Sequence, residues 1–337
     1  MVPILEREQM AVAVAALRAA DQIVLASHIN PDGDTLGSML ALGWGLRSLG
    51  KSVTLLSADG VPATLGFLPG AEAVQTRTDR RDFDLAVVLD AGDLERIGVS
   101  QEAVRSAPTL IDIDHHVTAG QFGQIRLLDS TAAATAEIVY DVLLSLGVSP
   151  DLPIAVNLLC ALLTDTGSFR YRNVTPRTMA LGGEMIRLGA SPDSIAECVF
   201  ENKPFAAQKL LGRALESLQR TPDGRIVWAH VTQRDFADFD ATDEMTEGVV
   251  GAVRAVQGSD VALFLREMPT GRLRVSLRSR DPIDVTQVAA EFGGGGHRLA
   301  SGCTLDGPLA AAEALLVAAV ERHIAGVPAA AVPACAA

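Results

Sequence analysis

Short apolar runs alternate with helical patterns over the first half of the chain. The strand-like runs are IVLAS at 23–27, SVTLLS at 52–57, DLAVVLD at 84–90 and TLIDID at 109–114, and a helical pattern at 36–50 follows the first of them. Continuous apolar runs separated by helices are typical of a parallel sheet that is covered on both faces. The pattern therefore predicts an α/β fold whose first domain has a parallel sheet flanked by helices.

The pattern changes in the second half of the chain. Helical patterns dominate from about 132 to 218, and Pro204 interrupts them in ENKPF. The strand-like segments RIVWAHV and DVALFLREMPTGRLRVSLRS, the latter with a tight turn at PTGR, then predict a smaller second α/β domain. We expect a first domain, a helical linker, a second domain and a loose tail at residues 1–190, 191–220, 221–327 and 328–337.

Charge and aromatic content narrow the range of partners. The 337 residues include 28 basic and 41 acidic ones, for a formal net charge of -13, so general attraction to a phosphate backbone is not expected. Two Trp, two Tyr and ten Phe are too few to stack the successive bases of a long strand. Any nucleic-acid partner should therefore be short, and no long nucleic acid is expected.

Neither export nor a membrane span is indicated. The beginning of the chain, MVPILEREQM, lacks the basic and apolar regions of a signal peptide, and the longest apolar stretches are shorter than a bilayer span. The cysteines Cys160, Cys198, Cys303 and Cys335 form no CxxC pair, so reduced thiols are expected. These features predict a cytoplasmic chain with no membrane partner.

Clusters of acids and histidines follow the predicted strands directly. HINPDGD at 28–34 follows the first run, Asp90 ends the third run, and the triplet Asp114, His115 and His116 closes the fourth. The carboxyl ends of parallel strands meet at one edge of a sheet, where ligands bind. On its own, each cluster also suits a turn, a helix cap or an exposed histidine without a role. Because three strand ends place acids or histidines at one edge of the sheet, a functional site is favoured over these structural roles.

A fourth candidate, Asp165 in LLTDTGSFRY, ends an apolar helical pattern. A carboxylate there is costly to bury without a cation or hydrogen-bond donors, and a helix cap around 164–168 is the structural alternative. Four carboxylates and two imidazoles together suit two divalent cations, and hard oxygen ligands mixed with imidazole, without thiolate, favour Mn²⁺ or Mg²⁺ over structural zinc. Two such ions promote displacement at phosphorus, so the sequence predicts phosphoester hydrolysis. The predicted metal ligands are His28, Asp32, Asp34, Asp90, His115 and Asp165.

The second domain offers a glycine-rich segment and several arginines. In GGGGH at 293–297, backbone N–H groups can approach an anion closely, and His297 adds a donor; a flexible loop is the alternative. The segment lacks the GK[ST] ending of a Walker A loop. Arginine suits bidentate phosphate binding, and Arg278 is singled out because it lies late in its predicted strand. The arginines of this region are Arg266, Arg272, Arg274, Arg278 and Arg280.

These motifs, in order from DQIVLASHINPDGD to GGGGHRLASG, resemble the DHH/DHHA1 phosphoesterases, and within them the bacterial nano-RNases, which are bifunctional oligoribonucleases and 3'-phosphoadenosine 5'-phosphate (pAp) phosphatases. The resemblance implies a DHH catalytic domain and a DHHA1 substrate-binding domain with a cleft between them, and it gives the six ligands above to Mn²⁺. It also implies that Asp114 and His116 are catalytic, with His116 at the scissile phosphate or the leaving group. The implied substrate-binding residues are Arg278, Ser279, Gly294, Gly295, Gly296 and His297.

The leading hypothesis is a Mn²⁺-dependent phosphodiesterase that releases mononucleotides from very short RNA and also removes the 3'-phosphate of pAp. A phosphodiesterase for cyclic di-AMP or linear pApA is the nearest alternative. A catalytically silent nucleotide sensor is an alternative of another class, although all six predicted ligands are in place. Relatives of the family suggest a homodimer.

Overall fold

The computed structural model describes residues 7–116, 120 and 122–329, so most of the predicted tail lies outside the described residues. The chain divides into two compact units, Met1–Asn202 and Lys203–Ala337. The two ends of the predicted linker pack into different units: α7 (Pro192–Ala196) buries Ile195 in the core of unit 1, whereas α8 (Phe205–Glu216) buries Leu210 in a core of unit 2. Among the described helices, none has the length and apolar character that crossing a bilayer requires.

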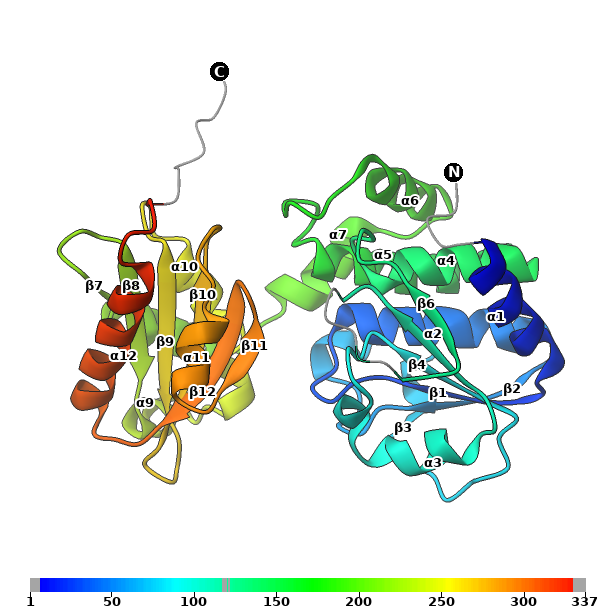
Figure 1. The fold of residues 1–337 in the computed structure, drawn as a ribbon, viewed down its shortest axis with the longest axis horizontal. Coiled ribbons are helices and arrows are strands. Elements are labelled where there is room, and N and C mark those ends of the chain that lie inside the picture. Colours follow the sequence, from blue (N-terminus) through cyan, green and yellow to red (C-terminus); the bar gives the residue numbers. More distant parts are fainter. Residues whose placement is uncertain (1–6, 117–119, 121, 330–337) are drawn as a thin grey trace. The chain divides into compact units, whose positions relative to one another are not determined.

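Unit 1 is built on a six-stranded sheet in which every strand pair is parallel (Figure 1). The strand order is β3-β2-β1-β4-β5-β6, so the direction in which strands are added reverses between β1 and β4. Ligands bind beyond the carboxyl ends of the strands at such a reversal. The strands are β1 (Gln22–Ala26), β2 (Ser52–Leu56), β3 (Val74–Gln75), β4 (Leu85–Leu89), β5 (Leu110–Asp114) and β6 (Ile125–Leu128).

Helices cover both faces of this sheet, as continuous apolar strands require. One face packs under α3 (Gln101–Ser106) and the 3₁₀ segment Leu94–Ser100. The helices of the other layer form the larger core (Figure 1). In that layer Gly37 lets two helices approach closely, because a Cβ there would collide with the Asn157 carbonyl oxygen. The helices are α1 (Arg7–Ala19), α2 (Gly33–Ser48), α4 (Thr135–Leu146), α5 (Leu152–Asp165), α6 (Pro176–Arg187) and α7.

Unit 2 has a second six-stranded sheet, with the order β11-β12-β10-β9-β8-β7. Its strand pairs are antiparallel except for β8 with β9. The predicted turn at PTGR joins β9 to β10, with Gly271 at a φ of 77°. The strands are β7 (Gln219–Arg220), β8 (Ile226–Val231), β9 (Val261–Glu267), β10 (Leu273–Ser279), β11 (Gly295–His297) and β12 (Ala300–Leu305).

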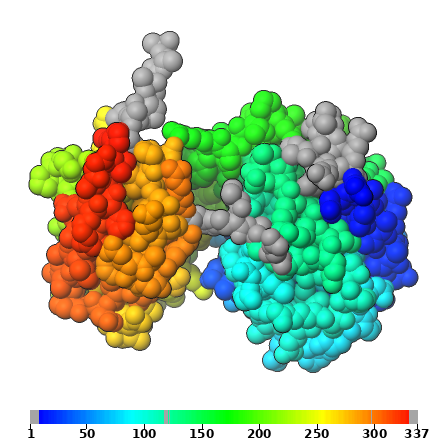
Figure 2. Space-filling view, in the orientation of Figure 1, coloured from blue at the N-terminus to red at the C-terminus, as the bar shows by residue number. Residues whose placement is uncertain are grey.

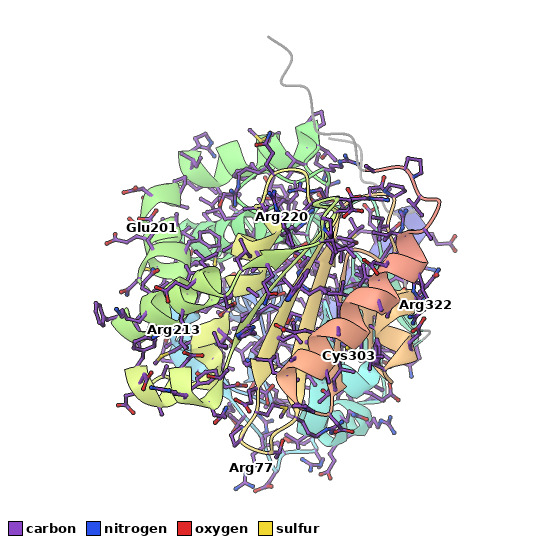
Figure 3. The ribbon with its side chains drawn as sticks, turned by 90° about the vertical axis from the view of Figure 1, so that its left-hand side faces the viewer. Arg77, Glu201, Arg213, Arg220, Cys303 and Arg322 are labelled. Atoms are coloured by element: carbon purple, nitrogen blue, oxygen red, sulfur yellow. The ribbon has the colours of Figure 1, made fainter. Side chains whose placement is uncertain are left out.

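The two faces of the second sheet differ in their cover. On one face α11 (Thr286–Glu291) and α12 (Leu309–Ile324) bury Leu263, Val275 and Leu277. The helix α12 forms an outer ridge of the unit (Figure 2) and crosses in front of the strands with Arg322 towards one end (Figure 3). On the other face α8, α9 (Gln233–Phe239) and α10 (Val249–Arg254) form a core mainly with β8 and β9. Polar side chains therefore remain on this face at β10 and β12.

Candidate active site

The strand ends of unit 1 bring together all six predicted metal ligands. His28 follows β1 and its Nε2 lies 3.8 Å from Asp32 Oδ1 and 3.8 Å from Asp90 Oδ2, beyond the adjacent strand β4. His115 follows β5, and its Nε2 lies 3.3 Å from Asp165 Oδ2, 3.5 Å from Asp90 Oδ1 and 3.8 Å from Asp34 Oδ2. Asp90 thus lies between the two imidazoles, one oxygen facing each.

The predicted ligand atoms form two groups, each within 4.8 Å: His28, Asp32 and Asp90, and Asp34, His115 and Asp165. Asp90 and His115 also form a third such group with His116. Both imidazoles face them with Nε2, because Nδ1 of His28 lies 2.7 Å from the Ile29 carbonyl oxygen and Nδ1 of His115 lies 3.2 Å from that of Ala132. A carbonyl oxygen only accepts, so Nδ1 carries the proton and the lone pair of a neutral ring is on Nε2. The arrangement suits cation binding at both groups.

HINPDGD is both a helix start and part of the acid cluster. Asp32 is the N-cap of α2, and its Oδ1 accepts hydrogen bonds from the N–H groups of Asp34 at 3.0 Å and Thr35 at 3.1 Å. Asp34 lies within the first turn, and its carboxylate accepts from the N–H groups of Thr135 at 2.7 Å and Ala136 at 3.1 Å. Because α4 has no side-chain cap of its own, Asp34 supplies one from another helix. Asp32 therefore serves as a helix cap, as the structural alternative predicted, and also belongs to the acid cluster.

Two residues beside the cluster were not anticipated from the sequence. The hydroxyl group of Thr135 donates to Asp90 Oδ1 at 2.9 Å, in addition to the backbone bond to Asp34. The amide of Asn173 donates to the carbonyl oxygens of Asp165 at 3.1 Å and Ala133 at 3.0 Å. Thr135 begins a recognisable helical pattern, but its sequence position does not reveal which carboxylate it contacts.

Burial decides the pKa shift of three of the four carboxylates. It raises the pKa of Asp34 to about 7 and that of Asp165 to about 6, and it raises the pKa of Asp90 well above its ordinary value. Neighbouring carboxylates add to each shift, and His115 opposes it for Asp34 and Asp165. Burial also acts to raise the pKa of Asp32, but hydrogen bonding and charge from His28 outweigh it and lower the value. Burial acts to lower the pKa of His115, but Asp34 and Asp165 outweigh it and raise the value.

The cluster lacks a cationic side-chain partner other than histidine. Within the described part of the chain, no lysine or arginine forms an ion pair with Asp32, Asp34, Asp90 or Asp165. Four acids held this close are costly to ionise without added positive charge. Carboxylate and imidazole donors without thiolate are suitable ligands for Mn²⁺ or Mg²⁺. The side chains present therefore fit a pair of divalent cations.

Asp114 and His116 form a separate pair at the end of β5. Asp114 Oδ1 lies 2.6 Å from His116 Nδ1 and accepts from the His116 N–H at 2.8 Å, while Oδ2 accepts from the Gly92 N–H at 2.6 Å. Burial acts to raise the pKa of Asp114, but hydrogen bonding and charge from His116 outweigh it and lower the value. An ionised Asp114 therefore fixes the His116 ring and directs Nε2 away from itself.

The glycine-rich segment of unit 2 lines an open cavity of about 590 Å³ with Arg272, Arg274 and Thr304. Glycine is required at Gly294, because a Cβ there would collide with the Gly302 carbonyl oxygen, and at Gly296, whose φ is 139°. Gly295 lies in β11 and also lines the cavity. The backbone of His297 ends that strand, and its side chain is outside the described atoms.

The predicted substrate contacts on β10 divide between the two sheet faces. Arg278 is half-buried on the face with exposed Arg274, whereas Ser279 is fully buried and its hydroxyl group donates to the Ile283 carbonyl oxygen at 2.8 Å. Neighbouring strand residues point to opposite faces, so Ser279 lies on the covered face of the sheet, opposite Arg274 and Arg278. Of the other arginines, Arg266 bonds Thr246 and Asp243, and Arg280 bonds the carbonyl oxygens of Ser259 and Arg254.

Known proteins are similar to this chain over most of its length. The model of the DHH family N-terminal domain matches residues 22–164, and the DHHA1 domain model matches residues 223–326. The bifunctional oligoribonuclease and PAP phosphatase NrnA of Thermus thermophilus is 34% identical over 303 residues, which are 89% of this chain and 89% of that protein. The chain belongs to the DHH/DHHA1 family.

Solved structures agree with this membership. An exopolyphosphatase-related protein from Bacteroides fragilis matches with a TM-score of 0.91 and 26% identity, over 96% of this chain and 98% of that one. RecJ from Thermus thermophilus, in complex with Mn²⁺, has the same fold with a TM-score of 0.58 and 17% identity, over 98% of this chain and 56% of that one. The predicted family, the α/β fold and the phosphoesterase class of this DHH/DHHA1 chain are confirmed.

Proposed function

We propose that this chain hydrolyses short oligoribonucleotides to mononucleotides with two divalent cations, and that it also removes the 3'-phosphate of pAp. The observation that carries the proposal is the convergence of four carboxylates and two imidazoles on one sheet edge with no lysine or arginine paired to them among the described residues. Support for the substrate comes from the Thermus thermophilus relative, whose name states both activities.

The proposed cation ligands are the two groups that Asp90 joins. One group is His28, Asp32 and Asp90, and the other is Asp34, His115 and Asp165, with Asp90 Oδ1 only 3.5 Å from His115 Nε2. Two divalent cations held there would supply Lewis acidity and balance the charges of the carboxylates and a phosphate. Mn²⁺ is the preferred ion in this proposal, supported by the Mn²⁺ bound to RecJ, and the donor types suit it.

His116 is the proposed acid beside the scissile phosphate, and Asp114 is its positioning residue. The 2.6 Å contact from Asp114 holds a proton on Nδ1 and fixes the ring, so that Nε2 is the atom proposed to give a proton to the leaving oxygen. The Gly92 N–H bond to Asp114 keeps the carboxylate from turning. These three groups form a unit next to Asp90, which lies 3.5 Å from His116 Nδ1.

Unit 2 is the proposed anchor for the rest of the substrate. Arg278, Gly294, Gly295, Gly296 and His297 keep the substrate-binding role expected from the sequence, and Arg274 joins them because it is exposed beside the glycine segment. Exposed arginine and backbone N–H groups suit phosphate oxygens. The predicted homodimer and cytoplasmic location stay predictions.

The test is a turnover assay with defined substrates. The metal-stripped protein is given Mn²⁺, Mg²⁺ or EDTA and then RNA dimers to pentamers, pAp, pApA or cyclic di-AMP, and the products are separated by chromatography. We expect mononucleotides from the short RNAs and AMP from pAp, with Mn²⁺ more effective than Mg²⁺ and no turnover in EDTA. A folded, metal-loaded protein that binds nucleotide without turnover would instead indicate a sensor. Faster turnover of cyclic di-AMP than of short RNA would favour the cyclic di-AMP phosphodiesterase.

A further inference from the structure

A tightly hydrogen-bonded loop, residues 166–173, follows Asp165 directly. The N–H groups of Arg170 and Tyr171 both donate to the Thr166 carbonyl oxygen at 3.0 Å, and the Phe169 N–H donates to Thr166 Oγ1 at 2.9 Å. Ser168 and Phe169 have φ values of 61° and 60°, in the left-handed region that non-glycine residues rarely adopt. Such strain persists only where the surroundings fix it, and it is concentrated at functional sites.

Two aromatic rings of this loop pack against glycines. Phe169 packs against the larger core of unit 1, and a Cβ on Gly182 would collide with its ring. A Cβ on Gly167 would collide with Tyr171, and the nearest atoms are three ring carbons rather than the hydroxyl oxygen. The Tyr171 ring therefore covers Gly167 with its face. Because Tyr171 is 52% exposed, much of the ring remains open to solvent.

The loop holds this ring beside the acid cluster. Gly167 is two residues from Asp165, and Asn173 ties the end of the loop to the carbonyl oxygens of Asp165 and Ala133. The N–H groups that bind Asp34 begin two residues after Ala133, at Thr135. Asn173 thus connects the loop to the end of α5, which carries Asp165, and to the segment before α4, whose first N–H groups bind Asp34.

The composition around the ring is unusual for this chain. Exposed Arg170 and Arg172 flank Tyr171, although acidic residues outnumber basic ones by 41 to 28 overall. The other tyrosine, Tyr140, is buried in the core. Arg170 Nε donates to the Gly167 carbonyl oxygen at 2.6 Å, so this arginine helps to fix the loop. The exposed Tyr171 ring is suited to a nucleobase, because every base has a π-face that stacks on an aromatic ring.

We propose that Tyr171 is a base-stacking residue that makes the site prefer nucleotide esters to phosphate esters without a base. The inference rests on the proposed function, since the stacked base would belong to a nucleotide whose phosphate lies at the acid cluster. Stacking is tolerant of base identity, so the preference is for a base over none rather than for adenine over the others. The structural alternative is that the ring only shields Gly167.

The experiment compares the parent with Tyr171→Ala, Tyr171→Phe and Tyr171→Leu. Phe205→Ala, which removes an 81% exposed ring elsewhere, is the matched control. Affinities of the Mn²⁺-loaded proteins for AMP and for ribose 5-phosphate are measured by calorimetry, and KM and kcat are measured with an RNA dinucleotide. For Ala and Leu we expect AMP affinity to fall about 10-fold and the dinucleotide KM to rise similarly, with little change in kcat or in ribose 5-phosphate affinity. Phe and the control should match the parent.

The Leu variant separates stacking from packing, because it keeps an apolar cover on Gly167 without a π-face. Unchanged AMP affinity in Tyr171→Leu, or an equal loss for AMP and ribose 5-phosphate, would overturn the inference. The ligand comparison also separates this inference from the proposed function. If the parent cleaves no dinucleotide, the proposed function fails, whereas the AMP preference over ribose 5-phosphate still tests the role of Tyr171.

Discussion

The two sheets of this protein place their polar chemistry in different ways. In unit 1 all strands are parallel and both faces are covered, so the acids and histidines lie beyond the strand ends, where Asp34 and Asp90 are nonetheless buried. In unit 2 part of one face of a mostly antiparallel sheet is uncovered, and the polar residues Arg274, Ser276 and Arg278 alternate along a single strand. The first arrangement concentrates charge in a buried cluster, and the second displays charge to solvent.

This difference predicts different consequences of mutation. Charges in the buried cluster are weakly screened and interact strongly with one another, whereas an exposed arginine interacts through water and salt. Changes in the buried cluster of unit 1 should therefore alter cation binding and kcat, and changes on the uncovered face of unit 2 should alter KM alone. The predictions below test that division, beginning with the largest effect.

Asp90→Asn should have the largest effect, because Asp90 faces both imidazoles and both proposed cation groups. We expect kcat/KM for an RNA dinucleotide to fall on the order of 1,000-fold, and calorimetry should register weaker Mn²⁺ binding. In EDTA the variant should melt at a higher temperature than the parent near pH 8, because burial raises the pKa of Asp90 well above its ordinary value and an amide does not carry that cost. Asp93→Asn, at an exposed 3₁₀ N-cap, is the control. Parent-like turnover in Asp90→Asn would exclude the two-cation site.

Thr135→Val should have a smaller effect of the same kind. The substitution keeps the shape and the backbone N–H bond to Asp34 but removes the 2.9 Å hydroxyl bond that orients Asp90 Oδ1. Loss of a residue that orients a metal ligand typically weakens metal binding or activity 10- to 100-fold, so we expect Mn²⁺ affinity to fall by about 10-fold or more. Thr135→Ser should restore it. If Val and Ser give the same Mn²⁺ affinity, the hydroxyl group does not position Asp90.

Much of unit 1 could be predicted from the sequence, because its signals are local. The runs at 23–27, 52–57, 84–90 and 109–114 correspond to β1, β2, β4 and β5. Parallel strands bring the residues at their carboxyl ends to one edge of the sheet, so the convergence of these acids and histidines could be predicted from the strand pattern. The edge strands gave no such signal, since β3 has two residues and β6 alternates between buried and half-buried positions.

The contacts that depend on tertiary packing could not be predicted. Thr135 reaches Asp90 across 45 residues of sequence, and only the tertiary packing that brings the start of α4 to the carboxyl end of β4 joins them. The burial of Ser279 is different, because the sequence held the information that was needed to anticipate it. Alternate residues of a strand share a face, so Arg278 belongs with Arg274 and not with its neighbour Ser279.

Arg274→Ala tests the uncovered face of unit 2. Arg274 makes no hydrogen bond or ion pair within the described residues, so its loss should leave the fold intact. We expect the KM for an RNA dinucleotide to rise about 5- to 10-fold at low salt and less at high salt, while kcat and Mn²⁺ affinity stay unchanged. Arg322→Ala, which removes an exposed arginine from α12, should match the parent. A fall in kcat without a change in KM would contradict the division between the two units.

Asp112→Asn tests whether burial raises the pKa of a unit 1 carboxylate that is not one of the proposed ligands. Asp112 lies within β5, fully buried, with no hydrogen-bond partner for either carboxylate oxygen. Burial raises its pKa to about 8, nearby Asp114 adds to the shift, and Arg126 opposes it. The folded chain therefore keeps a proton on Asp112 that the unfolded chain releases near pH 4.

The stability that this proton provides is complete below pH 4 and is lost as the pH rises towards 8, at up to about 1.4 kcal/mol per pH unit. Urea unfolding in EDTA at pH 5, 6, 7 and 8 measures it as the difference between the parent and Asp112→Asn. Because the proposed ligands are the same in both proteins, their titration cancels, and the parent should lose stability relative to the variant at each step. Asp193→Asn, at an exposed position of α7, should follow the parent at every pH. If the difference in stability between the parent and Asp112→Asn does not vary with pH, Asp112 is ionised in the folded chain.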